Sequence, residues 1–246
     1  MPNAWDAGSA KLLATLGFQA LATTSSGYAA TLGKLDGTTT RDESLAGAQA
    51  LVEAVEVPVS ADLENGFGAD PAGVTETVRL AIEAGLAGCS IEDFDGDQIY
   101  PLDVATERVG AAVDAAHGGS THFVLTARAE NLIRGRPDLD DTIARLKAYE
   151  DAGADVLFAP GLASADEIRQ VVDAMVRPVN VLVVPGVPPV TELAELGVSR
   201  VSVGGAFAFA ALGTLAAAAI ELRDRGTYGY GEAARTGLRA ARDAFG

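Results

Sequence analysis

The sequence predicts a single α/β domain over residues 1–246, folded as a (β/α)8 TIM-type barrel. The chain has 246 residues, and a barrel of this kind typically needs about 250. Short apolar runs, many of them β-branched, alternate with amphipathic stretches of helical length. Strict alternation of strands and helices implies a parallel sheet with the helices outside it.

Eight short apolar runs are predicted to form the strands. The first strand precedes or includes Pro2–Ala4, at the start of the sequence. The others follow at intervals that suit repeated βα units. They are expected at Ala20–Thr23, Val57–Ala61, Gly88–Ile91, Phe123–Ala127, Val156–Ala159, Val179–Val183 and Arg200–Val203.

Helices are predicted between these strands. The expected ranges are Gly8–Leu16, Arg41–Val55, Pro71–Ala84, Asp103–His117, Leu139–Ala152, Ser164–Ala174, Val190–Leu196 and Ala206–Arg225. The tail from Thr227 to Gly246 lies outside the repeat. We interpret it as a turn followed by an extra C-terminal helix.

A motif at four helix-to-strand turns supports the barrel. In each, a helix end is followed by glycine and then by a strand, at Gly17, Gly85, Gly153 and Gly197. Glycine closes a helix in the left-handed conformation at low cost. The alternative architecture is an open doubly wound sheet, which would favour a GxGxxG loop after the first strand. Residues 3–8 (NAWDAG) do not match that loop.

Composition limits the classes of partner and compartment. The formal charge is −16 at pH 7, which disfavours nucleic acid and anionic membranes because both are bound through Lys and Arg. A single cysteine, Cys89, fits a reducing compartment, and no leader is recognised, so we expect a cytoplasmic protein. The most apolar run, Ala206 to Ile220, is shorter than the roughly 18 residues of a membrane span.

Acidic side chains follow two neighbouring strands, at the end of the barrel where enzymes of this fold keep their active sites. Asp62 and Glu64 come after the third strand, and Glu92 after the fourth. Spaced two apart on a strand, Asp62 and Glu64 are expected to point the same way. Converging carboxylates repel one another unless a cation joins them. Oxygen ligands without nearby His or Cys favour Mg²⁺ or Mn²⁺ over zinc.

Arg128, at the end of the fifth strand, is expected to bind a substrate carboxylate through its planar guanidinium group. The alternative for each acid is a structural ion pair or a helix cap. Their concentration at one end of the barrel disfavours that alternative for the set as a whole.

Five short segments distributed over the chain are similar to those of one superfamily. They are residues 2–6 (PNAWD), 32–37 (LGKLDG), 61–68 (ADLENGFG), 90–93 (SIED) and 127–130 (ARAE). Each segment alone is a weak signal, but together they are specific. The chain resembles the isocitrate lyase/phosphoenolpyruvate mutase superfamily and looks like a short bacterial-type member.

The resemblance implies a cofactor, a substrate class and an assembly. Mg²⁺, or Mn²⁺, would be held by Asp62, Glu64 and Glu92 together with Asp36, in part through water. Catalytic roles would belong to Asp36 and Arg128, and the substrate would be bound by Arg128 with Thr24, Ser25 and Ser26. Superfamily members act on small 2-oxo acids, or form them, through enolates that Mg²⁺ and N–H groups stabilise. A homo-oligomer is implied, a dimer of dimers with C-terminal helices packed or swapped between subunits.

The loop after the fourth strand departs from the lyases of the superfamily, which carry there a Lys-Cys-Gly-His-like sequence whose Cys is the acid. Residues 94–102 (FDGDQIYPL) contain no Cys, Lys or His. We therefore expect C–C or P–C cleavage by decarboxylation or hydrolysis. The alternatives are a 2-methylisocitrate lyase-like or phosphonomutase-like activity, and a non-catalytic protein that binds oxo acids.

Overall fold

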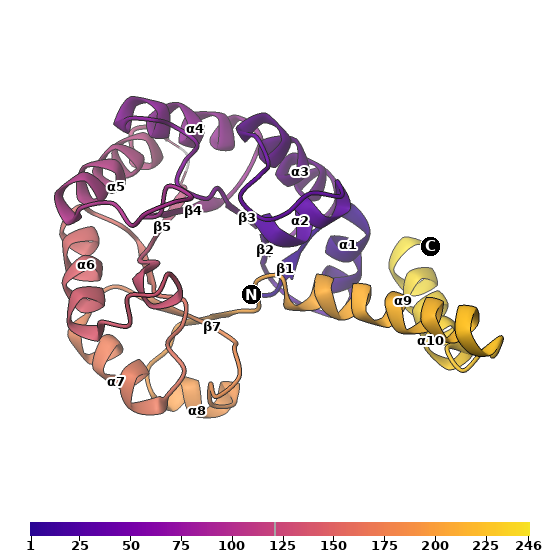
Figure 1. Ribbon diagram of the computed structural model, residues 1–246. Coiled ribbons are helices and arrows are strands. Elements are labelled where there is room, and N and C mark those ends of the chain that lie inside the picture. The colour runs from indigo at the N-terminus through magenta and orange to yellow at the C-terminus, as the bar shows by residue number, and fades with distance from the viewer. Residues whose placement is uncertain (121) are drawn as a thin grey trace.

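The computed structural model describes residues 1–120 and 122–246 as a ring of eight parallel strands surrounded by helices (Figure 1). Each strand pairs with its neighbours in chain order, from β1 to β8. The strands are β1 (Asn3–Ala4), β2 (Leu21–Thr23), β3 (Val59–Asp62), β4 (Gly88–Glu92), β5 (Val124–Arg128), β6 (Val156–Phe158), β7 (Val179–Leu182) and β8 (Arg200–Ser202). The predicted (β/α)8 barrel is confirmed.

The helices form the outer layer and pack mainly alanine, valine and leucine side chains against the strands. They are α1 (Ala7–Thr15), α2 (Ser25–Thr31), α3 (Arg41–Ala54), α4 (Pro71–Glu83), α5 (Leu102–His117), α6 (Leu139–Asp151), α7 (Ala165–Ala174), α8 (Val190–Glu195), α9 (Ala206–Arg225) and α10 (Gly231–Phe245), with a 3₁₀ turn η1 (Asn131–Ile133). Capping boxes at Asp6, Thr40 and Ser164 start α1, α3 and α7.

The strand register places the predicted site residues side by side. Asp62 is the register partner of Ser90 across β3 and β4. Glu92 is the partner of Arg128 across β4 and β5. Because these strands run parallel, their carboxyl ends meet at one rim of the barrel, and the acids and the arginine meet there with them.

The seven-residue helix α2 was not predicted from the sequence. The Thr24 side chain caps it by accepting a hydrogen bond from the N–H of Gly27 at 3.4 Å. Gly27 permits close packing, since a Cβ there would lie 3.1 Å from the Cβ atoms of both Trp5 and Ala208. A Ser-Ser-Gly start is a poor helix signal, because these residues equally favour turns and caps.

The prediction that Asp62 and Glu64 lie on one strand and point the same way is wrong, because β3 ends at Asp62. Glu64 has a positive φ of 49° and belongs to the following turn. A non-glycine residue in this region is strained, and such strain is often found at functional sites. The turn after β3, and not the alternation of a strand, therefore places Glu64 at the rim with Asp62.

The side chain of Asn3 joins the first and last strands. Its Oδ1 accepts hydrogen bonds from the N–H groups of Val203 at 2.9 Å and Gly204 at 3.0 Å. Its Nδ2 donates to the carbonyl oxygen of Thr23 at 2.7 Å. One buried amide thus connects β1 and β2 to the loop after β8.

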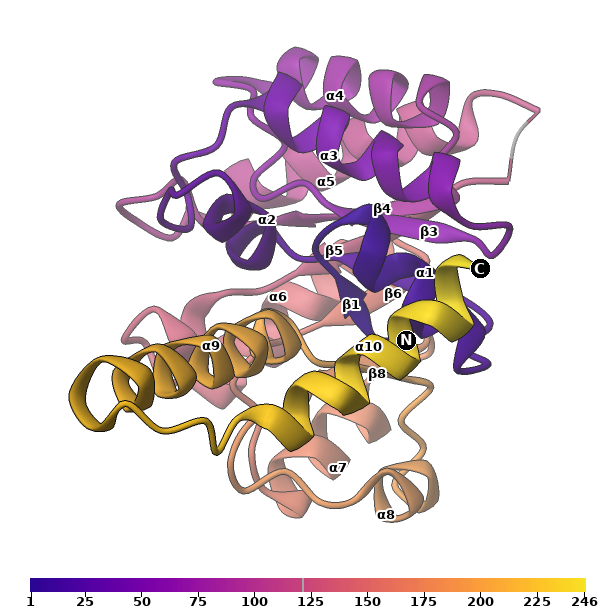
Figure 2. The same cartoon turned by 90° about the vertical axis from the view of Figure 1, so that its right-hand side faces the viewer.

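The two C-terminal helices extend from the barrel (Figures 1 and 2). α9 projects away from the ring, and α10 returns to pack against α1, where the Phe245 ring approaches Gly8. α9 exposes large apolar side chains, among them Phe207, Phe209, Leu212 and Leu215. By length and hydropathy alone α9 is also sufficient to cross a membrane, a weak criterion that the core helices of soluble proteins also meet.

Candidate active site

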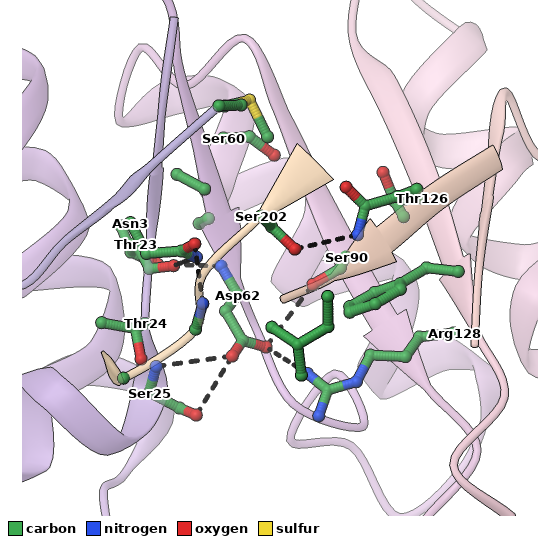
Figure 3. Close-up of a pocket in the computed structure, with 18 of the residues that line it drawn as sticks. Asn3, Thr23, Thr24, Ser25, Ser60, Asp62, Ser90, Thr126, Arg128 and Ser202 are labelled. Atoms are coloured by element: carbon green, nitrogen blue, oxygen red, sulfur yellow. Dashed lines mark hydrogen bonds and ion pairs between the residues drawn. The ribbon is translucent and has the colours of Figure 1, made fainter. Parts of the chain in front are cut away.

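Two adjoining cavities open at the carboxyl-terminal rim of the barrel. The first, of about 180 Å³, runs into the barrel interior and is lined by Ser25, Asp62 and Arg128 among others (Figure 3). The second, of about 560 Å³, lies under the loop after β4 and is lined by Glu64 and Glu92. Asp36, Ser25 and Arg128 border both cavities, so the two form one continuous site.

Asp62 is the hub of this site (Figure 3). Its Oδ2 accepts hydrogen bonds from the Ser25 hydroxyl at 3.1 Å and the Ser25 N–H at 3.4 Å. Its Oδ1 lies 3.4 Å from both the Ser90 Oγ and the Arg128 Nη1. The N–H of Asp62 donates to the Thr23 hydroxyl at 2.8 Å, which fixes the end of β3.

Arg128 contacts three carboxylates at once. Its guanidinium lies 3.2 Å from Glu92 and 3.4 Å from Asp62, and it donates to Glu130. Burial lowers the pKa of Arg128, but the attraction of Glu92, Glu130 and Asp62 outweighs burial and raises the pKa overall. The Phe158 ring lies 5.5 Å from the guanidinium carbon and supports its face. Arg128 is therefore permanently charged and held in one orientation.

Two of the predicted metal ligands resist ionisation. Burial, and then the charges of Asp62 and Asp36, raise the pKa of Glu64 to about 7, even though Thr39 donates a hydrogen bond to its Oε1 at 3.0 Å. Burial also raises the pKa of Glu92 well above its ordinary value, with Glu130 and Asp62 adding to the effect. Without a further cation, these two carboxyls therefore favour the neutral form, because burial and neighbouring carboxylates disfavour their ionised form.

The donor set fits a hard divalent cation. The rim carries the carboxylates of Asp36, Asp62, Glu64, Glu92 and Glu130, against the guanidinium groups of Arg128 and Arg134. Within residues 1–120 and 122–246, no three Asp, Glu, His or Cys side chains are grouped closely enough to bind one ion directly. Mg²⁺ tolerates such a site, because it commonly binds one or two carboxylates and keeps several water ligands.

The predicted hydroxyl residues after β2 have distinct positions. Ser25 turns its hydroxyl to Asp62 at the cavity mouth. Thr24 is buried, and its Oγ1 lies 3.1 Å from the Ser26 Oγ and also caps α2. All three line the first cavity. Of these three residues, only Ser25 forms a hydrogen bond with Asp62 in the described chain. Ser25 is thus better placed than Thr24 or Ser26 to meet a substrate.

Sequence reasoning gave no role to Glu130, which is fully buried. Glu130 contacts Arg128 through one oxygen, and its other oxygen accepts from Arg134 at 3.0 Å. The signal available in the sequence was its spacing two residues after Arg128, which sends both side chains toward the same rim.

A buried network behind the site was also missed. Asp93 accepts hydrogen bonds from Arg145 at 3.0 Å and from the Tyr149 hydroxyl at 2.6 Å. Its other oxygen accepts from the N–H of Glu130 at 2.8 Å. Arg145 and Tyr149 are four residues apart on α6 and so share one face. The network ties the ends of β4 and β5 to α6 and thereby positions Glu130 and Arg128.

The raised pKa of Glu64 predicts a pH-dependent stability. In Mg²⁺-free buffer, we expect the free energy of unfolding to fall as pH rises from about 5 to about 8, by at most about 1.4 kcal/mol per pH unit per proton. Glu64 keeps its proton up to about pH 7 when folded but ionises near 4.5 when unfolded. The folded state therefore holds more protons in this window, and raising the pH favours unfolding.

Urea denaturation at several pH values tests this expectation. Glu64→Gln has no carboxyl to titrate, so its stability should vary less between pH 5 and 8. Mg²⁺ should reduce the loss in the wild-type protein, because a bound cation stabilises the ionised carboxylates. The same pH slope in the wild-type and Glu64→Gln proteins would contradict the assignment to Glu64.

Comparison with known proteins identifies the family. Residues 1–223 match the phosphoenolpyruvate phosphomutase family. A crystal structure of a lyase/mutase-type protein from Burkholderia cenocepacia J2315 has a TM-score of 0.95 at 55% identity, covering 98% of this chain and 89% of that one. A structure of oxaloacetate acetylhydrolase in complex with oxalate has a TM-score of 0.88 at 27% identity, covering 99% and 87%.

A curated relative extends the comparison to a named lyase. The 2,3-dimethylmalate lyase of Eubacterium barkeri is 34% identical over 181 residues, which are 69% of this chain and 61% of that enzyme. This chain thus covers less than two thirds of that lyase. The family match, by contrast, includes every strand of the barrel and every residue of the acidic rim. The chain therefore belongs to the phosphoenolpyruvate mutase family and is an enzyme of the isocitrate lyase/phosphoenolpyruvate mutase superfamily.

Proposed function

We propose that this enzyme is Mg²⁺-dependent and cleaves a C–C or P–C bond of a small 2-oxo acid or related carboxylate, through an enolate, by decarboxylation or hydrolysis. The observation that carries the proposal is the rim where Asp62 and Glu92 contact Arg128 and where Glu64 lines the same continuous site. A rim with excess carboxylates and one fixed guanidinium suits a divalent cation together with an anionic substrate.

Each rim residue has a separate role in this proposal. Asp36, Asp62, Glu64 and Glu92 would hold the cation between them, in part through water ligands. When bound, Mg²⁺ would act as a Lewis acid that stabilises negative charge developing on a substrate oxygen. Arg128 borders both cavities and would orient the substrate carboxylate. The N–H and hydroxyl of Ser25 supply hydrogen-bond donors at the same mouth.

A substrate screen tests the proposal. The purified protein with Mg²⁺ is offered oxaloacetate, phosphonopyruvate, 2-methylisocitrate and 2,3-dimethylmalate, and the products are followed as pyruvate, oxalate and acetate. We expect oxaloacetate to be consumed above the protein-free blank at about 1 s⁻¹ or faster, and the rate to disappear with a chelator. If no oxo acid is consumed while oxalate with Mg²⁺ still raises the melting temperature, the chain is a non-catalytic binder instead.

The second candidate is lyase-type or phosphonomutase-type cleavage, which the similarity to 2,3-dimethylmalate lyase favours. Lyase-type cleavage requires a general acid to protonate the leaving enolate, and the loop over residues 94–102 contains no Cys, Lys or His. The single thiol, Cys89, is buried in β4, and burial raises its pKa. Asp95 accepts hydrogen bonds from the N–H groups of Gln98 and Asp97, and the bond from Gln98 leads the effects that lower its pKa. An ionised Asp95 stabilises the turn and has no proton to donate at neutral pH.

Asp95→Asn and Asp97→Asn are therefore expected to keep kcat within a fewfold of wild type. An asparagine at position 95 can still accept the two turn hydrogen bonds. A positioned general acid normally contributes about 10²- to 10⁴-fold, so steady-state kinetics on the active substrate will separate the cases. A loss of 100-fold or more in either variant would identify a loop carboxyl as the acid.

We also propose a cytoplasmic homo-oligomer, a dimer of dimers, in which the apolar side of α9 packs against or swaps onto a second subunit. Phe209, Leu212 and Leu215 expose apolar surface that a closed assembly would bury. Light scattering at micromolar concentration should report a mass above that of the monomer, and Leu215→Glu should reduce it. Val176→Glu is the matched control, because Val176 is an exposed apolar residue outside α9. A wild-type monomer would contradict the proposal.

A further inference from the structure

The interior of this barrel carries several small polar side chains, whereas bulky branched side chains fill the interior of most barrels of this fold. Below the rim, the first cavity is lined by small polar side chains (Figure 3). They are Asn3, Ser60, Ser90, Thr126, Asn180 and Ser202. Because the same cavity includes Asp62 and Arg128, it is continuous from the rim to this polar interior.

A cationic side chain lies at the far end of the cavity. Arg200, the first residue of β8, donates from Nε to the Asn180 Oδ1 at 3.0 Å and from Nη2 to the Thr126 Oγ1 at 2.9 Å. Both partners are neutral, and among the ion pairs of the described residues Arg200 has none. Burial lowers the pKa of Arg200 to about 10, which leaves it charged at neutral pH.

Among the described residues, Arg200 and the buried Arg108 both lack a carboxylate partner, but Arg108 donates to two backbone carbonyls and lines neither cavity, whereas Arg200 lines the first cavity. Arg128 contacts three carboxylates, and Arg145 contacts Asp93 and Asp141. Arg200 is only partly exposed, and a largely enclosed cation without a counterion is costly to the fold. A charge retained in an open polar cavity therefore points to an anion that visits it.

The spacing inside the barrel suits a short diacid. Thr126, which contacts Arg200, lies two residues below Arg128 on β5, a rise of about 7 Å. This separation is close to the length of a four-carbon dicarboxylate. If a four-carbon dicarboxylate binds with one carboxylate at the rim, its other carboxylate would lie beside the Arg200 guanidinium.

We propose that Arg200 forms a second carboxylate-binding subsite inside the barrel, which takes the distal carboxylate of a dicarboxylic substrate held at the rim. If the ligand is a dicarboxylic substrate, this inference rests on the proposed function. A free carboxylate of small size would satisfy the same chemistry, with the Thr126 and Ser202 hydroxyls as neighbours in the cavity.

The test compares succinate with butyrate, four-carbon acids that differ in one carboxylate, and includes formate as a free carboxylate. Affinities are measured by calorimetry at constant ionic strength with Mg²⁺. We expect the wild type to bind succinate at least about tenfold more tightly than butyrate, as a charge-assisted hydrogen bond warrants. Arg200→Gln should remove the preference, and Arg177→Gln should retain it, because Arg177 is exposed on the outside of the barrel.

The outcomes separate the two sources. Loss of formate binding in Arg200→Gln, with no succinate preference in the wild type, would support the subsite with a free carboxylate as its ligand. The subsite would be overturned if Arg200→Gln left the affinities for all three acids unchanged. It would also be overturned if Arg177→Gln reduced these affinities as much as Arg200→Gln does. Absence of carboxylate binding to the wild type would overturn it as well.

The outcomes also separate this inference from the proposed function. A succinate preference that depends on Arg200, in a protein that consumes no oxo acid, would support the subsite and refute the proposed activity. Turnover of an oxo acid without any effect of Arg200→Gln on affinity or KM would support the proposed activity and refute the subsite.

Thermal unfolding without ligand provides an independent check on Arg200. Because its guanidinium has no counterion within residues 1–120 and 122–246, Arg200→Gln should melt at the same temperature as the wild type or higher. Arg200→Lys should keep part of the succinate preference, since the charge remains without the planar fork. A melting temperature several degrees lower in both variants would show that Arg200 is needed to hold the barrel together and would overturn the binding role.

Discussion

Replacing Arg128 by alanine is expected to abolish turnover and to lower the free energy of unfolding by about 3–5 kcal/mol. The fully buried Glu130 would lose its contact with Arg128 and retain only the half-exposed Arg134. Glu92 would likewise lose its nearest cation. Removing one member of a buried ion pair is costly because the remaining charge stays buried without compensation.

Urea denaturation and steady-state kinetics on the same preparations measure the two effects. Arg128→Met combined with Glu130→Gln removes both charges, so it should recover much of the stability and none of the activity. This double variant separates the folding role of the arginine from its substrate role. Substantial turnover by the double variant would show that Arg128 positions Glu130 and does not bind substrate.

Asp62→Asn is expected to abolish turnover while the fold persists. The amide oxygen can still accept the hydrogen bonds from Ser25, so local packing should change little. The negative charge that would hold Mg²⁺ is lost, however. Mg²⁺ at a hundredfold excess over its Kd should stabilise the wild type by about 2.7 kcal/mol and stabilise the variant much less.

Asp70→Asn is the matched control for this substitution. Asp70 lies in the loop before α4 and caps that helix by accepting from the N–H of Gly73 at 2.9 Å. Asparagine caps helices as well as aspartate does, so stability, Mg²⁺ response and turnover should all be retained. Equal Mg²⁺-induced melting shifts in the wild type and Asp62→Asn would refute the assignment of Asp62 as a metal ligand.

Most of the fold was predictable because two strong signals agree. Strand and helix periodicities alternate along the chain, and glycines such as Gly17, Gly85 and Gly153 mark the turns in the left-handed conformation that the structure shows. The site followed from the fold, since polar residues after parallel strands meet at one rim. This argument placed Asp62, Glu92 and Arg128 beside one another, and the strand register confirms their proximity.

What could not be predicted depends on contacts distant in the sequence or on weak local signals. α2 is too short for its periodicity to be recognised. The left-handed turn at Glu64 carries a residue type that seldom adopts it. The role of Glu130 depends on contacts with Arg128 and Arg134 that spacing only suggests. Arg200 looks like an ordinary strand-edge arginine until the absence of a counterion in its described surroundings is seen in three dimensions.

The Asn3 amide has a consequence for how this barrel forms. The other strand pairs join neighbours in chain order, whereas Asn3 meets Val203 across 200 residues of sequence. The entropy of closing so long a loop must be overcome before the contact contributes any stability, which makes it a late event in folding. We therefore expect the strands to pair one after another and the ring to close last, through the Asn3 amide and the Met1 amino group, which donates to the carbonyl oxygen of Val201 at 2.8 Å. Under denaturing stress, the ring should first come apart at this same junction.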